Sequence, residues 1–363
     1  MAKKERAFPL WLAIALGAAL AALVAGGVWY YRSQAQSVRQ KAVETLASIG
    51  ELKAQEIIAW RRERLADAAI LMDRQGLENR ILSYLAEPFP QHAQPLLERF
   101  EAYRKHYGYA DVLLVDARGE IRLSLSGRRD GHCAYPESLA EAFRDRRPVL
   151  SELHVGPRYP APHISAVAPV FGTRGKGGGE AIGAVILVSD ASRYLYPLVQ
   201  SWPTPNATAE TTLSRREGDD IVFLNPLRHR PGAALSVRVP VARADVPAVM
   251  AVQGRRGVME GPDYRGVPVI AYLLPIEGSA WAMVAKQDKA EVFAEWHARS
   301  RLILFVLAAL AAGLVALVLV AWELDQHRHY RRLYDSESRL RTATERNSIT
   351  LKAIGDAVIV TDV

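Results

Sequence analysis

The chain has 363 residues and a formal net charge of +7, which is modest for this length. Its arginines are scattered rather than gathered with aromatic residues into a basic stripe, which argues against a nucleic-acid-binding protein. Charged residues, prolines and glycines are spread through one long segment between two apolar runs, and this excludes a multi-pass transporter. Cys133 is the only cysteine, so neither an intrachain disulfide nor a cysteine metal-ligand pair is expected.

Two apolar runs are long enough for membrane-spanning helices. Such a helix needs about 20 mostly apolar residues to cross a hydrocarbon core of roughly 30 Å. Leu10–Val28 and Leu302–Trp322 meet this requirement. The aromatic residues Trp29–Tyr31 and Trp322 lie at their ends, as is typical of a membrane–water interface. We therefore assign residues 10–31 and 302–322 to transmembrane helices.

Basic residues beside the two runs predict the orientation. Two lysines and an arginine lie within residues 1–9, and Arg328, Arg331 and Arg332 follow the second run. By the positive-inside rule, both termini lie in the cytoplasm and residues 32–301 lie outside. A cleaved signal peptide is the alternative for the first run, but the apolar stretch exceeds the roughly 7 to 15 residues typical of such peptides.

After the first run, the sequence predicts one long amphipathic helix over residues 32–75. Apolar residues recur at helical spacing between Val38 and Leu71, and Gly50 is the only glycine or proline in the segment. The same reasoning predicts further helices over Pro95–His106, Leu139–Arg146, Ala191–Ser201 and Asp288–Arg301, the last of which runs into the second apolar run.

Period-two patterns and short apolar runs predict strands in the rest of the segment. Asp111–Asp116 and Glu120–Ser126 flank a turn and form a hairpin. The glycine-rich loop between residues 171 and 181 lacks the Walker pattern and is interpreted as a flexible hairpin tip. The other expected strands are Pro148–Leu153, His163–Phe171, Ala181–Ser189, Glu210–Arg215, Asp220–Leu224, Gly257–Glu260, Val267–Leu274 and Trp281–Ala285.

This order, a long helix followed by two small sheets in series, resembles the double Cache family of bacterial extracytoplasmic sensors over residues 32–301. The stretches that carry the resemblance are Ala59–Arg61, Leu113–Gly119, Ser214–Asp220 and Asp263–Gly266. The resemblance implies an α+β fold with two PAS-like antiparallel sheets. It divides the segment into a stalk helix (32–75), a distal module (76–201), a proximal module (202–287) and an exit helix (288–301). It also implies a bacterial inner membrane, with the sensor in the periplasm.

The segment after the second run has two features. Leu333, Leu340, Asn347 and Ile354 recur every seven residues, which favours a short parallel coiled coil in a cytoplasmic signalling helix (323–350). A solvated single helix is the alternative. Residues 351–363 resemble the opening of a cytoplasmic PAS domain, with a lead-in helix, Gly355–Asp356 and a first strand.

A lone strand is not stable without its sheet, so we expect the chain to be part of a longer receptor. Proteins that look like this carry a histidine kinase, a diguanylate cyclase or phosphodiesterase, or a chemoreceptor tail after the PAS domain. No motif of these outputs occurs in the sequence, so no catalytic residue and no cofactor are assigned. We expect a parallel homodimer.

The family resemblance places a ligand pocket in the distal module, between its sheet and the loops of residues 150–163. Asp190 resembles the acidic residue that pairs with the ligand ammonium in amino-acid-binding members. The stretch 155–160 lacks the tryptophan of their Arg-x-Trp-Tyr element, so the charged donors favour a small organic acid instead. A solvated rim is the alternative for any one residue. The candidate ligand-binding residues are Arg122, His154, Arg158, Tyr159, His163, Ser165 and Asp190.

Two other groups of residues could indicate an enzyme or a metal site, but they fit these functions less well. Ser124 or Ser126 with Asp130 and His132 supplies the residue types of a hydrolytic triad, but triads are recognised by geometry, and these residues crowd a predicted turn. The spacing of His154 and His163 matches no helical or hairpin pair of metal ligands, so no metal site is expected.

The function that follows is a receptor that senses a small extracytoplasmic molecule and relays the signal to the PAS domain. A membrane-anchored enzyme or a structural envelope protein is the alternative.

Overall fold

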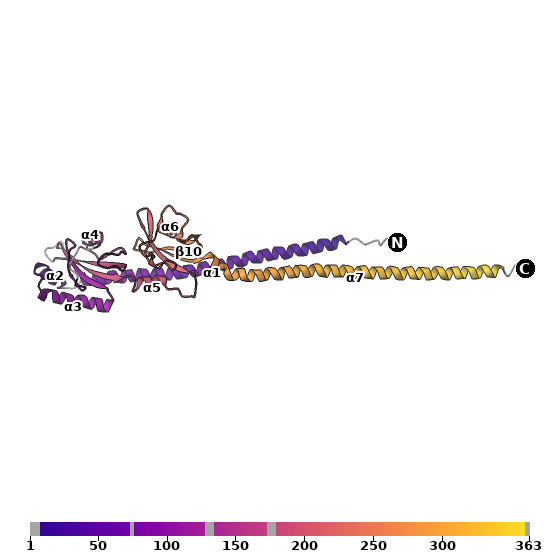
Figure 1. Ribbon diagram of the computed structural model, residues 1–363, viewed down its shortest axis with the longest axis horizontal. Coiled ribbons are helices and arrows are strands. Elements are labelled where there is room, and N and C mark those ends of the chain that lie inside the picture. Colours follow the sequence, from indigo (N-terminus) through magenta and orange to yellow (C-terminus); the bar gives the residue numbers. More distant parts are fainter. Residues whose placement is uncertain (1–7, 73–75, 128–133, 173–178, 360–363) are drawn as a thin grey trace. The chain divides into compact units, whose positions relative to one another are not determined.

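The computed structural model of the protein describes residues 8–72, 76–127, 134–172 and 179–359 (Figure 1). The chain divides into two compact units. Arg39–Phe293 form a sensor unit that contains both sheets, and Met1–Val38 with Ala294–Val363 form a terminal unit. Two long helices, α1 (Leu10–Met72) and α7 (Lys289–Ile359), contribute residues to both units.

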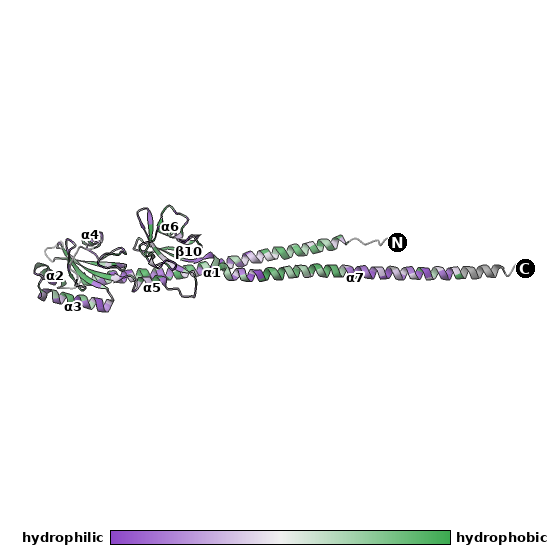
Figure 2. Ribbon diagram, viewed as in Figure 1, coloured by the Kyte–Doolittle hydropathy of each residue, from purple (hydrophilic) through white to green (hydrophobic). Residues whose placement is uncertain are grey.

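The terminal unit pairs the first part of α1 with α7. Each helix contains a stretch long and apolar enough to cross a membrane, coloured as hydrophobic in Figure 2. The rings of Phe8 and Trp322 are tilted against each other with centroids 5.3 Å apart, and the ring centroids of Tyr31 and Trp296 are 5.2 Å apart. Between these pairs a Cβ on Gly27 would lie 2.9 Å from a methyl of Leu307, so the helices approach closely at this glycine. The two apolar stretches therefore run antiparallel, side by side.

Helix α7 continues further than the sequence predicts. The last residues were expected to begin a strand, but α7 is helical through Ile359, which corrects that expectation for residues 357–359. A strand leaves its backbone groups unpaired unless a neighbouring strand lies beside it, whereas a helix pairs them within the segment. Residues 360–363 lie outside the described part of the chain.

The distal sheet has five antiparallel strands in the order β2-β1-β5-β4-β3. The hairpin β1–β2 and the long β4–β5 pair confirm the strands expected there. One face packs against the end of α1 together with α2 and α3, and the other packs against α4. The elements are α2 (Leu77–Ala86), α3 (Pro90–Tyr107), β1 (Asp111–Asp116), β2 (Ile121–Ser124), α4 (Pro136–Asp145), β3 (Val149–Leu150), β4 (His163–Phe171) and β5 (Ala181–Asp190).

The proximal sheet has six antiparallel strands in the order β8-β7-β6-β11-β10-β9. α6 covers one face, and α5 with α1 covers the other. The elements are α5 (Leu195–Gln200), β6 (Glu210–Glu217), β7 (Asp220–Phe223), η1 (Pro231–Ala233), β8 (Arg238–Pro240), α6 (Pro247–Val252), β9 (Gly257–Pro262), β10 (Pro268–Pro275) and β11 (Ala282–Asp288). β11 ends where α7 begins.

Helix α1 contacts both sheets in turn. Leu46 packs on the proximal sheet, Ile57 and Trp60 lie in a core shared by the two modules, and Leu71 lies under the distal sheet. Gly50 permits this packing, because a Cβ there would already lie 3.1 Å from Leu274 Cδ1 of β10. The single glycine of the predicted stalk thus marks a place where the helix lies close to β10.

A buried cluster of charges joins the strands of the proximal module. Lys286 Nζ lies 2.9 Å from Glu210 Oε2 and 2.7 Å from Asp263 Oδ2, and all three side chains are at most 5 % exposed. Arg265 pairs with Asp263 at 2.7 Å and also with Asp288, the last residue before α7. Burial alone would raise the pKa of Asp263, but Lys286 and Arg265 hold it below its usual value. The cluster therefore ties β6, the turn between β9 and β10, and the end of β11 into one unit, directly before α7.

Lys286→Met should destabilise the protein strongly, because it leaves two buried carboxylates without their shared cation. Removal of one partner from a buried ion pair costs about 3–5 kcal/mol. Lys289→Met is the matched control, since Lys289 pairs with Glu260 at the surface, at 2.9 Å and half exposed. Its loss should cost at most about 1 kcal/mol. Unfolding of the detergent-solubilised chain measures both, and equal losses would contradict the structural role of the cluster.

Candidate ligand-binding site

A pair of histidines lies at one edge of the distal sheet. His154 and His163 form an antiparallel bridge, with backbone N–H to carbonyl distances of 3.1 and 2.9 Å, and their ring centroids are 4.0 Å apart. The expectation that their spacing matches no hairpin pair is wrong. The intervening loop folds back on itself, with Gly156 donating to the carbonyl of Tyr159, and this brings residues nine apart in the sequence opposite each other.

Backbone contacts fix the tautomer of both rings. Nδ1 of His154 lies 2.9 Å from the carbonyl oxygen of Glu152, and Nδ1 of His163 lies 3.0 Å from that of Ala161. Because a carbonyl only accepts, each Nδ1 carries the proton, and each neutral ring then presents a bare lone pair at Nε2. Both Nε2 atoms are buried and lack a hydrogen-bond partner within the described residues.

Burial keeps these rings neutral. It lowers the pKa of both histidines, and that of His163 to about 4, where the neighbouring His154 lowers it further. The carbonyl of Ala161 and the carboxylate of Asp190 act in the opposite direction but are outweighed. The pair is thus an acceptor of hydrogen bonds near neutral pH, not a cationic anchor.

Asp111 organises the neighbouring part of the site. Its carboxylate is buried and accepts hydrogen bonds from the Tyr159 hydroxyl at 2.5 Å and from Ser124 Oγ at 2.9 Å. Its other oxygen accepts from the backbone N–H groups of Val112 and Ser126. Burial and this hydrogen bond raise the pKa of Tyr159, so its hydroxyl stays protonated. The ring of Tyr159 is held edge-on to His163 at 4.9 Å.

Strand register places these groups on one face of the sheet. Val188 of β5 pairs with Asp111 of β1 on one side and with Ser165 of β4 on the other, so the three side chains form a row across the sheet. His163 lies two residues before Ser165 on the same face. Ser165 is completely buried, and its hydroxyl has no partner within the described residues.

The remaining candidates from the sequence lie at the edge of this group or outside it. Arg158 donates to the Tyr159 hydroxyl at 3.2 Å and to Ser126 Oγ at 3.4 Å, at the rim. Asp190 lies opposite His163 in the register, but its Oδ1 accepts from Ser192. Arg122 lies instead at the β1–β2 hairpin, 3.3 Å from Glu120.

Sequence reasoning missed two members of the site, Asp111 and Tyr135. Tyr135, just before α4, packs edge-on against His154 at 4.9 Å. The available signal for Asp111 was an acidic residue at the first position of an otherwise apolar, buried strand. Ser124 and Ser126, considered for a hydrolytic triad, contact Asp111, while Asp130 and His132 lie outside the described residues.

Glu152 connects the histidine pair to the proximal module. Its backbone carbonyl accepts from His154, and its carboxylate accepts from Trp281 Nε1 and from Arg215 Nη1, both at 2.9 Å. Arg215 belongs to β6, and Trp281 directly precedes β11. One residue therefore joins the site to two strands of the second sheet.

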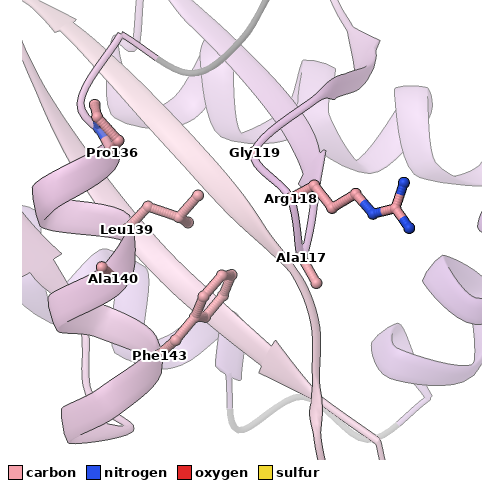
Figure 3. Close-up of a pocket in the computed structure, with 7 residues that line it drawn as sticks. All are labelled: Ala117, Arg118, Gly119, Pro136, Leu139, Ala140 and Phe143. Atoms are coloured by element: carbon pink, nitrogen blue, oxygen red, sulfur yellow. The ribbon is translucent and has the colours of Figure 1, made fainter.

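A separate hollow of about 200 Å³ lies between α4 and the β1–β2 turn (Figure 3). Leu139 and Phe143 point from the helix toward Ala117, while the Arg118 side chain extends away from the helix. Most of the residues that line the hollow are apolar, and several have small side chains. None of the candidate ligand-binding residues is among them. The histidine site is therefore the better candidate for recognition of a polar molecule.

Comparisons with known proteins agree with a sensor fold. No family model matches the sequence, and no curated protein matches it. Among solved structures, the sensory domain of the Campylobacter jejuni chemoreceptor Tlp3 matches with a TM-score of 0.51 and 12% identity, over 71% of this chain and 97% of that one. The complex of the Tlp3 ligand-binding domain with L-norvaline gives 0.52 and 12%, over 70% and 94%.

The ligand-binding domain of the Pseudomonas fluorescens chemoreceptor CtaA in complex with L-serine is also similar, with 17% identity and a TM-score of 0.45, over 69% of this chain and 99% of that one. At such identities the likeness concerns the fold alone. The chain thus has the fold of Cache-type chemoreceptor ligand-binding domains, with two helices apolar enough to span a membrane.

The histidine pair should show its tautomer and its low basicity in solution. Nitrogen-15 NMR should find His154 and His163 protonated at Nδ1 only, with His163 titrating near pH 4. In the unfolded chain histidine titrates at about 6.5, so the unfolded state binds the extra proton first and stability falls as the pH drops from 6.5 toward 4. His163→Asn should reduce this fall, whereas His92→Asn, on α3, should keep it. A His163 that is cationic at pH 6 would contradict the described geometry.

Proposed function

We propose that this chain is the input part of a transmembrane receptor that binds a small molecule at the distal module. The observation that carries the proposal is a group of three buried polar atoms, His154 Nε2, His163 Nε2 and Ser165 Oγ, that have no hydrogen-bond partner among the described residues. A buried polar group without a partner costs about 1–3 kcal/mol, and a bound ligand can recover that cost. The fold shared with chemoreceptor ligand-binding domains supports the same role.

The proposed ligand is a small organic acid. The similar Tlp3 domain was solved in complex with L-norvaline, which also carries a carboxylate. Arg158 at the rim supplies the charged donor for a carboxylate. The imidazole Nε2 atoms accept hydrogen bonds, so a carboxylate alone leaves them unsatisfied. Recognition by this site therefore requires more than an anion.

The proposed signal path runs from His154 through Glu152 to Trp281 and along β11 into α7. Its support is the unbroken series of contacts, since Trp281 directly precedes β11 and β11 ends at Asp288, next to α7. Transmission requires that the ligand bind two states of the sensor with different affinity. Glu152→Gln keeps the size of the side chain and weakens its bond to Arg215. It is therefore the variant that tests this signal path.

The location and output are proposed from the sequence. Two candidate spans and the basic flanks support a bacterial inner membrane protein with both termini in the cytoplasm and a periplasmic sensor. Relay to a cytoplasmic PAS domain and to a histidine kinase or diguanylate cyclase is supported only by the resemblance of residues 351–363. The helical course of α7 through Ile359 differs from the strand that this resemblance implies.

Ligand binding should appear as thermal stabilisation of the full chain in detergent or nanodiscs. A ligand at 100 times its dissociation constant stabilises the folded state by about 2.7 kcal/mol. A panel of small organic acids and amino acids should contain at least one that raises the melting temperature. Ser165→Ala and His163→Asn should lose most of the shift, and Arg122→Ala should keep it because Arg122 lies at the hairpin. No shift with any compound, or equal loss in Arg122→Ala, would contradict the proposed site.

We also propose a parallel homodimer, as expected from the sequence. The support is an outward side of α1 that carries large apolar residues, with Leu52 62% exposed and Ile70 44% exposed. Sedimentation of the solubilised chain should give the mass of a dimer at micromolar concentration, and Leu52→Glu should shift it toward the monomer. A monomer at every concentration would contradict this proposal.

A further inference from the structure

A basic turn lies at one end of the proximal sheet. Arg228, His229 and Arg230 follow one another in the sequence, and all three residues are exposed. Leu227 and Arg230 close the turn by an antiparallel bridge, with backbone N–H to carbonyl distances of 3.3 and 3.0 Å. Leu227 itself is buried in the core beneath α6. The turn is therefore fixed to the sheet and presents three basic side chains to the solvent.

Contacts within the sensor unit place this turn beside the first turn of α7. The guanidinium group of Arg228 donates to the carbonyl oxygens of Asn206 and Ala207, at 3.3 and 3.5 Å. The backbone N–H groups of Ala207 and Thr208 donate in turn to the carboxylate of Glu291, at 2.9 and 3.0 Å. Glu291 is the third residue of α7. One short loop thus joins the basic turn to the start of the exit helix.

The start of α7 is close along the chain to a predicted membrane span. Leu302, where the second apolar run begins, follows Glu291 by eleven residues, which is a rise of about 16 Å in a helix. The headgroup layer occupies roughly 5–7 Å outside the hydrocarbon core. The remaining gap is about 10 Å, which is comparable to the Debye length at physiological ionic strength. An exposed arginine at this level therefore feels the charge of the lipid headgroups.

The charge of the basic turn is not neutralised by ion pairs. Neither Arg228 nor Arg230 pairs with a carboxylate among the described residues. Two further cations beside the start of α7, Arg39 and Lys289, share the single carboxylate of Glu260, at 2.7 and 2.9 Å. The surplus of positive charge at the turn suits an anionic partner.

The surface next to the turn is hollowed. A shallow groove of about 530 Å³ runs from Arg230 along the residues that lead into β8. Arg238 and the exposed Ser236 also line it, but Arg238 already pairs with Glu217 at 2.7 Å. Arg230 therefore supplies the charge that is free for a ligand in the described groove. Arginine binds phosphate oxygens through two parallel N–H groups, so it recognises a phosphate by shape as well as by charge.

We propose that the basic turn and this groove bind the phosphate groups of anionic phospholipids, on the side of the membrane that faces the sensor. The inference rests on the proposed membrane location, and it adds a contact with the bilayer that belongs to the proximal module itself. A lipid is favoured over a soluble acidic partner because α7 keeps the turn near the headgroups, which raises their effective concentration. The expected consequence is that anionic lipid holds the base of the sensor at the membrane surface.

The test uses the full chain in nanodiscs, with a fluorophore at the tip of the turn. His229→Cys provides the attachment point and leaves both arginines in place, in a Cys133→Ser background that removes the other cysteine. Each disc contains a trace of lipid with a nitroxide quencher on its headgroup. Quenching should be stronger in discs that contain phosphatidylglycerol than in discs of phosphatidylcholine alone. High salt should remove this difference, because it screens the charges.

Removal of the two charges should remove the preference for anionic lipid. In the labelled chain, Arg228→Gln/Arg230→Gln should lose most of the difference between the two kinds of disc, because each arginine contributes about fivefold to the affinity for an anionic surface. Circular dichroism and the melting temperature show whether the variant folds. An unchanged difference in the folded variant would overturn the lipid site.

Arg255→Gln/Arg256→Gln is the matched control. It removes the same charge from another pair of exposed, adjacent arginines. That pair lies away from α7, because the next residue, Gly257, pairs with Leu273 near the end of β10, whereas β10 begins beside the last residue of β11. The control should keep the full difference between the discs. An equal loss would assign the effect to net charge rather than to this turn, and the site would fail.

Two further measurements separate the lipid site from its alternatives. Arg301→Cys, in the same background, places the fluorophore directly before the second apolar run. If this label is quenched while the label at residue 229 shows no preference for phosphatidylglycerol, the lipid site fails and the membrane location stands. If neither label is quenched in any disc, both fail. A fluorescence change at residue 229 with glycerol 3-phosphate, but no preference among the discs, would assign the turn to a soluble phosphate and overturn the lipid contact.

Discussion

The buried side of α1 is the constraint on which the sensor unit depends. This single helix contributes Leu46 to the proximal core, Ile57 and Trp60 to the core between the modules, and Leu71 to the distal core. Burial of each such side chain stabilises the fold by about 1.5–3 kcal/mol, so loss of contact along either sheet is costly. Because a helix is stiff along its axis, the two sheets cannot move independently of it. A change at one module must either shift α1 or be absorbed at the contacts between the modules.

The histidine site lies directly beside those contacts. Leu153 and Ile164, the chain neighbours of His154 and His163, are completely buried in the same core as Trp60 and Trp281. Successive residues of a strand point to opposite faces, so the histidine rings and this core share one piece of backbone. A ligand that moves the rings therefore acts on the packing of Trp281 as well as through the hydrogen bonds of Glu152. Close-packed interiors transmit such displacements because they contain little free space.

Sequence patterns predicted the larger elements because each has a strong local period. The strand His163–Phe171 has the bounds of β4, and residues 32–72 of the expected stalk helix lie within α1, since long runs of apolar spacing leave few alternatives. The six-residue helix α6 escaped prediction because it is too short to show a period. α3 begins at Pro90 rather than at Pro95, because either proline suits a helix start and packing decides between them. The histidine pair could not be predicted, since it depends on how the loop 155–162 closes, and Asp111 gains its role only through partners 13 and 48 residues away.

Two groups of buried polar residues differ in a way that separates structure from recognition. In the proximal module Lys286 has two carboxylate partners, and Asp263 has two cationic ones, so the cluster is closed and leaves nothing for a ligand to satisfy. In the distal module, His154 Nε2, His163 Nε2 and Ser165 Oγ have no partner among the described residues. His154 and His163 lie opposite each other across one bridge, and Ser165 follows His163 by two residues. The hydroxyls of Thr211 and Ser214 of β6 also lack a partner in the part of the chain that the structure describes, but strand alternation directs them to opposite faces, so they form no common site. Since an unsatisfied buried group costs stability, a group of them on one face persists only where a bound partner offsets that cost. This contrast supports the proposed recognition at the histidine pair and a structural role for the charged cluster in holding the exit strand in place.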